Sequence, residues 1–258
     1  MKIRILSIAL ILGSLSFLSA QDMYLPVSTT SKAAKAAYIK GIQATDSADL
    51  PTFYEAMNTA LKSDPDFFMA YAYLAIAETS FTQYEKAAPH IKSALAIDAT
   101  GLNKGELILR KALQTLDKDP KADVAKFMAS LTDAYPNNAQ AYGLAAISAS
   151  WISKDPQASV KYTQQVIELR PEFGGSYNTL GYNYMALGEM EKAKAAFDKY
   201  LELSPNEPNA YDSMGEYYMV AKDYARSAEY YDKAAKMGME LAEERAEKAR
   251  EAMKAAGN

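Results

Sequence analysis

The sequence lacks cysteine and is almost without histidine and tryptophan. Among its 258 residues there is no Cys, one His (His90) and one Trp (Trp151). The chain therefore has neither disulfides nor a thiol nucleophile. A single histidine excludes a metal site built on a His pair, and nucleophile–base pairs could be assembled only around His90. We predict that the protein is not an enzyme and holds no metal or cofactor. His90 is interpreted as a surface or packing residue, with a degraded active site around it as the alternative.

The sequence also has no surplus of positive charge. It carries 28 basic and 32 acidic side chains, a formal net charge of −4. Without the first 20 residues, which hold Lys2 and Arg4 and no acid, the net charge becomes −6. A nucleic-acid groove needs clustered Lys and Arg to displace counterions from phosphates. We therefore predict no nucleic-acid partner.

Only one long apolar run occurs, and it lies at the N-terminus. Residues 1–20 combine the basic start Lys2 and Arg4 with a short apolar stretch and small residues before Gln21. This order is typical of a secretory signal peptide. We predict an exported protein, periplasmic or secreted, with no integral membrane span after signal removal. An uncleaved anchor is the alternative. Residues 21–31, which we term the leader, are predicted to be extended, with Thr30 or Ser31 capping the first helix.

The chain contains an internal repeat with a period of 34 residues. A unit beginning at Tyr177 recurs at Tyr211, and each unit holds two helix-period apolar patterns joined by a short connector. Such a connector predicts that the two helices are antiparallel. The recurring first-helix residues are Tyr177, Leu180, Gly181 and Tyr184, then Tyr211, Met214, Gly215 and Tyr218, and those of the second helix are Ala193, Phe197 and Tyr200, then Ser227, Tyr231 and Ala234.

Prolines mark the ends of earlier units. Pro65, Pro136, Pro171 and Pro205 each follow a helical pattern, at spacings of 71, 35 and 34 residues. Proline cannot continue the preceding helix, so it suits these boundaries. We count about six helix pairs over residues 32–239. Residues 240–258, apolar on one face and charged on the other, are predicted to cap the end of the array.

The order of aromatic, Leu-Gly, aromatic, Ala, aromatic and Pro residues in these units resembles the tetratricopeptide repeat family. The resemblance covers residues 32–239 and is weakest over 101–136, where the first helix lacks the Gly and aromatic pairing. It implies an all-α, right-handed solenoid of antiparallel helix pairs. Together with the N-terminal segment, it indicates an exported bacterial-type repeat protein that acts by binding a protein or peptide. It also implies that the first helices of the pairs line a concave groove.

On this resemblance, a second stripe of first-helix residues faces the groove. Tyrosine and methionine offer adaptable apolar contact, and the acids could meet a Lys or Arg of a ligand. An unremarkable wet surface is the alternative interpretation of the stripe. Trp151 is interpreted as a plug under a turn, or otherwise as an exposed anchor near the groove. The predicted groove residues are Asn178, Tyr182, Met185, Asp212, Glu216, Met219 and Trp151.

Three functions fit these features. The first is an exported scaffold that binds a protein or peptide segment in its concave groove without catalysis. The second is a structural subunit of an envelope assembly that self-associates or stacks through its ends. The third is a binder of a small ligand or glycan that uses the tyrosine-rich sixth unit. The sequence leaves the identity of the partner and the oligomeric state open.

Overall fold

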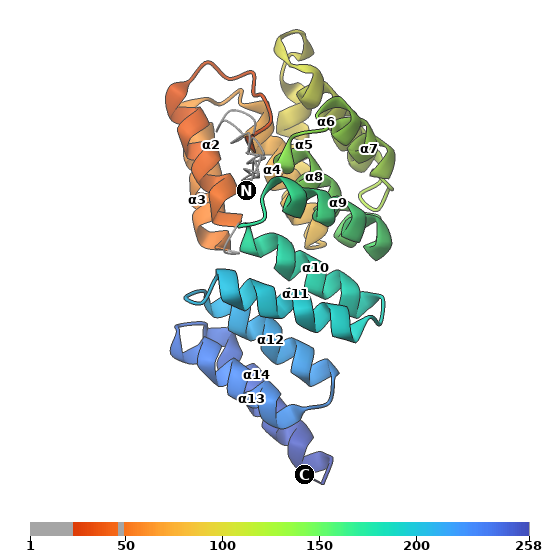
Figure 1. Cartoon of the computed structure of the whole chain (residues 1–258). Coiled ribbons are helices and arrows are strands. Elements are labelled where there is room, and N and C mark those ends of the chain that lie inside the picture. Colours follow the sequence, from red (N-terminus) through yellow and green to blue (C-terminus); the bar gives the residue numbers. More distant parts are fainter. Residues whose placement is uncertain (1–22, 46–48, 258) are drawn as a thin grey trace, which may run out of the picture.

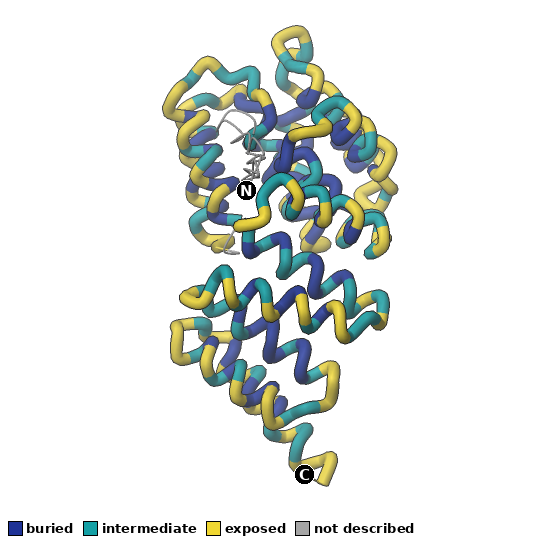
Figure 2. Tube along the Cα trace, viewed as in Figure 1, coloured by how far each residue is buried: buried dark blue, intermediate teal, exposed yellow. Residues whose placement is uncertain are grey.

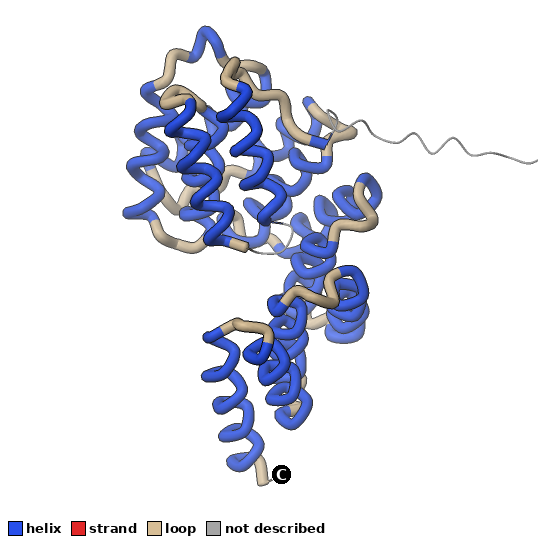
Figure 3. The backbone as a smooth tube through the Cα atoms, turned by 90° about the vertical axis from the view of Figure 1, so that its left-hand side faces the viewer, coloured by secondary structure: helices blue, strands red, loops and turns tan. Residues whose placement is uncertain are grey.

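The structure is a computed structural model that describes residues 23–45 and 49–257. The predicted signal peptide, residues 1–20, lies outside the described residues. In the described part, all regular secondary structure is helical, as Figure 3 shows. Figure 1 shows the helices following one another as an array from α2 to α14. The α-helices are α2 (Lys32–Ala44), α3 (Leu50–Ser63), α4 (Phe68–Ser80), α5 (Tyr84–Ala96), α6 (Lys104–Lys118), α7 (Ala125–Ala134), α8 (Ala139–Ile147), α9 (Pro156–Leu169), α10 (Gly174–Ala186), α11 (Met190–Leu203), α12 (Pro208–Val220), α13 (Tyr224–Lys236) and α14 (Glu240–Ala255).

These helices form six pairs followed by α14. The pairs are α2–α3, α4–α5, α6–α7, α8–α9, α10–α11 and α12–α13, and each helix packs mainly on its neighbours in sequence. The predicted all-α solenoid of about six helix pairs is thereby confirmed. No helix of the described residues is long and apolar enough to cross a membrane.

Small residues allow the two helices of a pair to approach closely. A Cβ atom placed on Gly181 of α10 would lie 2.5 Å from the Phe197 ring of α11. One on Gly215 of α12 would lie 2.7 Å from the Tyr231 ring of α13. Both rings are buried, so the Leu-Gly and aromatic positions of the repeat are packing positions. In Figure 2 the buried residues, in dark blue, follow the helix sides that face neighbouring helices, while the turns are exposed.

Proline marks the helix ends as predicted. Helices α3, α7, α9 and α11 each end two residues before Pro65, Pro136, Pro171 or Pro205. The 35-residue spacing between Pro136 and Pro171 is one longer than the period. In that unit α8 continues into a π-helical segment, η3 (Ser148–Ile152). A π-helical turn accommodates one additional residue, which accounts for the longer unit.

The turn inside several pairs requires a residue with positive φ. Gly188, between α10 and α11, has φ of 73°. The corresponding turns of three other pairs carry residues with a Cβ atom, namely Thr82, Lys154 and Lys222, with φ of 57°, 54° and 62°. A residue with a Cβ atom disfavours positive φ. The packing of the helix pair, and not the turn residue, therefore determines the geometry of this turn.

Candidate functional site

The predicted stripe on α10 and α12 is held together by hydrogen bonds. The Tyr182 hydroxyl donates to Glu216 Oε2 at 3.0 Å and lies 3.3 Å from the Ser213 hydroxyl. Its ring packs edge-on against Phe197 at a centroid distance of 5.2 Å. Burial, reinforced by the Glu216 charge, raises the pKa of Tyr182, so the phenol remains a donor. Tyr182 thus joins the fifth pair to the sixth rather than standing free.

Asp212 differs from its predicted role as an open groove acid. It is only 3% exposed and forms an ion pair with Arg245 of α14. The reason is that α14 packs against α13 and its Arg245 donates to Asp212 of α12. Burial raises the pKa of Asp212, an effect that Arg245 opposes. The basic partner that we expected a ligand to provide is supplied by the capping helix.

The remaining residues of the stripe lie at the margin of the packed interior. Met185 contacts the apolar cluster between the fifth and sixth pairs, and Met219 contacts the one beneath α14. Asn178 is half-buried, and its Oδ1 atom is buried without a hydrogen-bond donor among the described residues.

Trp151 is not a plug under a turn. It is 53% exposed, and it lies in the π-helical segment η3. The neighbouring Ser150 faces inward, with its hydroxyl bonded to Ser159 of α9 at 2.7 Å and to Asn183 of α10 at 2.8 Å. The π-helical turn changes which side chains of the segment face the neighbouring helices. Ser150 faces them, and Trp151 does not. Of the alternative interpretation, an exposed anchor near the groove, the exposure is confirmed.

The leader lies across the first helices of the first four pairs, and sequence reasoning did not find these contacts. Figure 1 shows it passing from the start of α2 toward α6. Leu25 is 3% exposed, and its N–H donates to Gln140 Oε1 of α8 at 2.6 Å. The Gln140 Nε2 group donates in turn to the hydroxyls of Tyr38 on α2 and Tyr73 on α4, both at 2.6 Å. One leader residue is thus linked to three first helices.

A second set of contacts fixes the following part of the leader on α6. The main-chain N–H and the hydroxyl of Ser28 both donate to Glu106 Oε1, each at 3.0 Å. Asn103, the N-cap of α6, donates its Nδ2–H to the Pro26 carbonyl at 2.9 Å. The Thr29 hydroxyl donates to Asp64 after α3. Ser31 then caps α2 by accepting from the Ala34 N–H, which confirms the predicted cap.

His90 lies on α5, with its side chain against α4. Its Nε2 atom is 3.6 Å from Glu78 Oε2, and its ring lies 6.2 Å from that of Tyr71. Burial lowers the pKa of His90 and raises that of Glu78, the latter effect being opposed by the charge of Lys86. This agrees with a packing residue. Helix α5 continues through Pro89.

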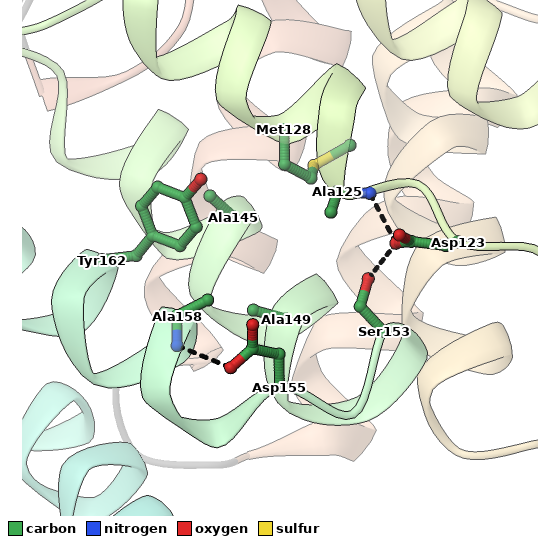
Figure 4. A pocket seen from close by; sticks show the side chains of 9 residues that line it. All are labelled: Asp123, Ala125, Met128, Ala145, Ala149, Ser153, Asp155, Ala158 and Tyr162. Atoms are coloured by element: carbon green, nitrogen blue, oxygen red, sulfur yellow. Dashed lines mark hydrogen bonds between the residues drawn. The ribbon is translucent and has the colours of Figure 1, made fainter.

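A small pocket lies between α7, η3 and α9, as Figure 4 shows. Its volume is about 150 Å³, below the several hundred Å³ typical of small-molecule sites. Its acids already have partners, because Asp123 accepts from Ala125 N–H and the Ser153 hydroxyl, and Asp155 caps α9 at Ala158. No group of acids and histidines in the described residues could hold a metal ion.

Comparison with known proteins matches one unit of the array. Residues 174–207, which contain α10 and α11, match the tetratricopeptide repeat family model. The similar solved structures include MamA, with 23% identity, 66% of this chain and 91% of that chain covered, and a TM-score of 0.45. TTC0263, a thermophilic TPR protein of Thermus thermophilus, has 16% identity, coverages of 84% and 98%, and a TM-score of 0.45. YrrB, a TPR protein with an unusual peptide-binding site, has 17% identity, coverages of 75% and 98%, and a TM-score of 0.47. No curated protein matches the sequence.

Proposed function

We propose that this chain, a tetratricopeptide repeat protein with a fold typical of protein–protein interaction, is an exported, non-catalytic scaffold. It binds a protein or peptide segment along its first helices. The observation that carries this proposal is the seating of the leader. An extended segment lies on the first helices with its main-chain groups bonded to side chains of α6 and α8. The same kind of surface continues on α10 and α12.

The stripe on α10 and α12 is the part of this surface that we assign to a partner. Its polar feature is the half-buried Glu216 carboxylate, which accepts from the Tyr182 hydroxyl. The half-buried Met185 adds apolar contact area. A segment with a Lys or Arg side chain fits this surface best, because it supplies donors and the opposite charge to the carboxylate.

Export and the absence of catalysis are parts of the same proposal. Export is supported by the order of basic, apolar and small residues in 1–20. A scaffold role without turnover is supported by the isolated His90 and by acids that already have intramolecular partners. Mass spectrometry of the full chain, expressed with a C-terminal tag and recovered from cell fractions, tests export. A species beginning at Gln21 outside the cytoplasm is expected, and an intact N-terminus would contradict cleavage.

Partner binding is tested by affinity capture with three tagged baits. The first is the unmodified chain, and the second carries Asn178→Ala and Glu216→Lys in the stripe. The third carries Glu202→Lys, which makes the same charge change at an exposed position on the second helix α11. Tyr182 is left intact because its ring packs on Phe197. A protein retained by the first and third baits and lost by the second is expected. Equal retention by all three would place binding away from the stripe.

A further inference from the structure

The leader is recognised mainly through its main chain. Its Leu25 and Ser28 N–H groups donate to side chains of α8 and α6, and its Pro26 carbonyl accepts from Asn103. None of these bonds is made to another main chain, so the leader is not a strand of a sheet. Another extended segment could make the same three bonds with its own main chain. The face that holds the leader is therefore organised as a peptide-binding surface.

Two positions of the leader carry side-chain selectivity. Leu25 lies in the apolar cluster that also contains Tyr38 and Tyr73, whose rings meet edge-on at 5.6 Å. The Ser28 hydroxyl donates to Glu106, which is fully buried. Glu106 also accepts from the Asn103 N–H, and no Lys or Arg among the described residues forms an ion pair with it. A buried carboxylate at the bottom of this face demands donors from whatever covers it.

The leader is attached to this face by few buried groups. Of residues 24–30 only Leu25 is buried, and Pro26 and Thr30 are exposed. The first four pairs also pack on one another directly, helix against neighbouring helix, without the leader. Release of the leader would uncover the Leu25 site and Glu106 without separating any helix pair. The anchor is thus one fully buried apolar side chain, Leu25, together with the partly buried Tyr24 and Val27 and a set of polar contacts.

We propose that the face formed by α2, α4, α6 and α8 is a second peptide-binding site and that the leader is its resident, displaceable occupant. The partner that fits is an extended segment with a large aliphatic residue at the Leu25 position. Three residues later it carries a hydrogen-bond donor, either a hydroxyl or a basic group that would neutralise Glu106. This inference rests on the same observation as the proposed function, the seating of the leader. The site is separate from the stripe on α10 and α12, so peptide binding here and partner capture by the stripe can fail separately.

The test uses the full chain and a labelled synthetic peptide with the sequence of residues 23–31, MYLPVSTTS. Leu25→Asp releases the leader, because a carboxylate cannot occupy the apolar site. Thr30→Asp is the matched control, since it adds the same charge to the leader at an exposed position. Fluorescence anisotropy is expected to show at least tenfold tighter peptide binding by Leu25→Asp than by the unmodified chain or Thr30→Asp. A peptide with Asp at the Leu25 position should not bind.

Specificity for this face is tested by Glu106→Gln combined with Leu25→Asp, which should weaken peptide binding because the acceptor loses its charge. Equal peptide binding by the unmodified chain, Leu25→Asp and Thr30→Asp would overturn the proposal. Sedimentation tests whether the leader that occupies the face comes from the same chain or from a second copy. A dimer formed by the unmodified chain and lost in Leu25→Asp would show that leaders are exchanged between copies, and the proposal of closure within one chain would then be rejected.

Hydrogen exchange on the unmodified chain keeps the proposal testable if Leu25→Asp does not fold. The Leu25 and Ser28 amides are expected to exchange at least tenfold faster than the interior amides of α4 and α8, because the leader opens separately. Exchange of these two amides only at the rate of global unfolding would show that the leader is an integral part of the core. That result would overturn the proposal.

Discussion

Arg245 of the capping helix α14 forms an ion pair with Asp212 of α12, whose side chain is only 5% exposed. The second carboxylate oxygen of Asp212 has no hydrogen-bond donor among the described residues. Burial of this acid is favourable only while the guanidinium remains beside it. The pair therefore couples the end of the array to the helix that covers it.

Replacing Arg245 by Ala is expected to lower the free energy of unfolding by about 2 kcal/mol. Removing one partner of a fully buried pair costs about 3–5 kcal/mol, and the value is smaller here because the Arg245 side chain is 41% exposed. Urea denaturation measures the change. Arg250→Ala, which breaks the more exposed pair with Asp232 on α13, is the matched control and should cost only about 0.5 kcal/mol. Equal losses would show that burial of Asp212 is unimportant.

Gly181→Ala is expected to destabilise the protein by about 1–3 kcal/mol, although alanine favours helices more than glycine does. The added Cβ would lie 2.5 Å from the buried Phe197 ring, which cannot move away without disturbing the pair. Gly143→Ala in α8 is the control, because its Cβ would meet no atom within 4 Å. It should gain about 0.5–1 kcal/mol from helix propensity. Thermal denaturation of both variants gives the comparison.

Thr82→Gly is expected to stabilise the protein by about 1 kcal/mol, because Thr82 holds a φ of 57° that a β-branched residue disfavours. The side chain is exposed, so little contact is lost. Gly188→Ala, at the same turn of the fifth pair, tests the reverse change. Its Cβ would have open space, so a loss of about 1 kcal/mol would come from backbone strain alone. Chemical denaturation of both variants measures these changes, and a destabilised Thr82→Gly would contradict the assignment.

The stability of His90→Asn relative to the unmodified chain is expected to increase as the pH falls from about 7.5 to about 5.5, a range that spans the ordinary pKa of histidine. Burial lowers the pKa of His90 in the folded chain from its ordinary 6.5. Below that value the unfolded chain binds a proton that the folded chain does not, so stability is lost as the pH falls. The Asn variant lacks this loss.

Glu78→Gln should show the opposite trend, because burial raises the pKa of Glu78 and protonation favours its folded form. Urea denaturation at several pH values provides both curves.

The helix pairs could be predicted from the sequence because packing in this fold is periodic. Gly181, Phe197 and Pro205 recur in equivalent positions, and each has a local consequence for helix contact or helix termination. The spacing of 35 residues between Pro136 and Pro171, one more than the period, also indicates the π-helical turn. That extra residue could have been used to predict that Trp151 is exposed. Repetition of a residue thus reveals the contacts and helix ends that the helix pairs have in common.

The polar contacts could not be predicted because they occur once and join distant residues. Gln140 lies 115 residues from Leu25, and Asn209, the amide at the same place in the sixth pair, donates to Tyr200 of its own neighbourhood instead. Arg110 of α6 is similar, since its guanidinium donates to three carbonyls at the end of α5, those of Ala94, Leu95 and Ile97. A pattern of apolar residues contains no information on such pairs. The leader could therefore be recognised as extended, but its binding face could not.

Gln140→Leu is expected to destabilise the protein by about 2–4 kcal/mol, because one amide satisfies three buried groups. The Leu25 N–H would lose its acceptor, and the Tyr38 and Tyr73 hydroxyls would lose a donor. Tyr73→Phe is the control. It removes one of the three bonds while Gln140 keeps the other two, so a loss of about 1 kcal/mol is expected. Guanidinium denaturation measures both losses. If the two variants were equally stable, the amide would not be the common link between the leader, α2 and α4.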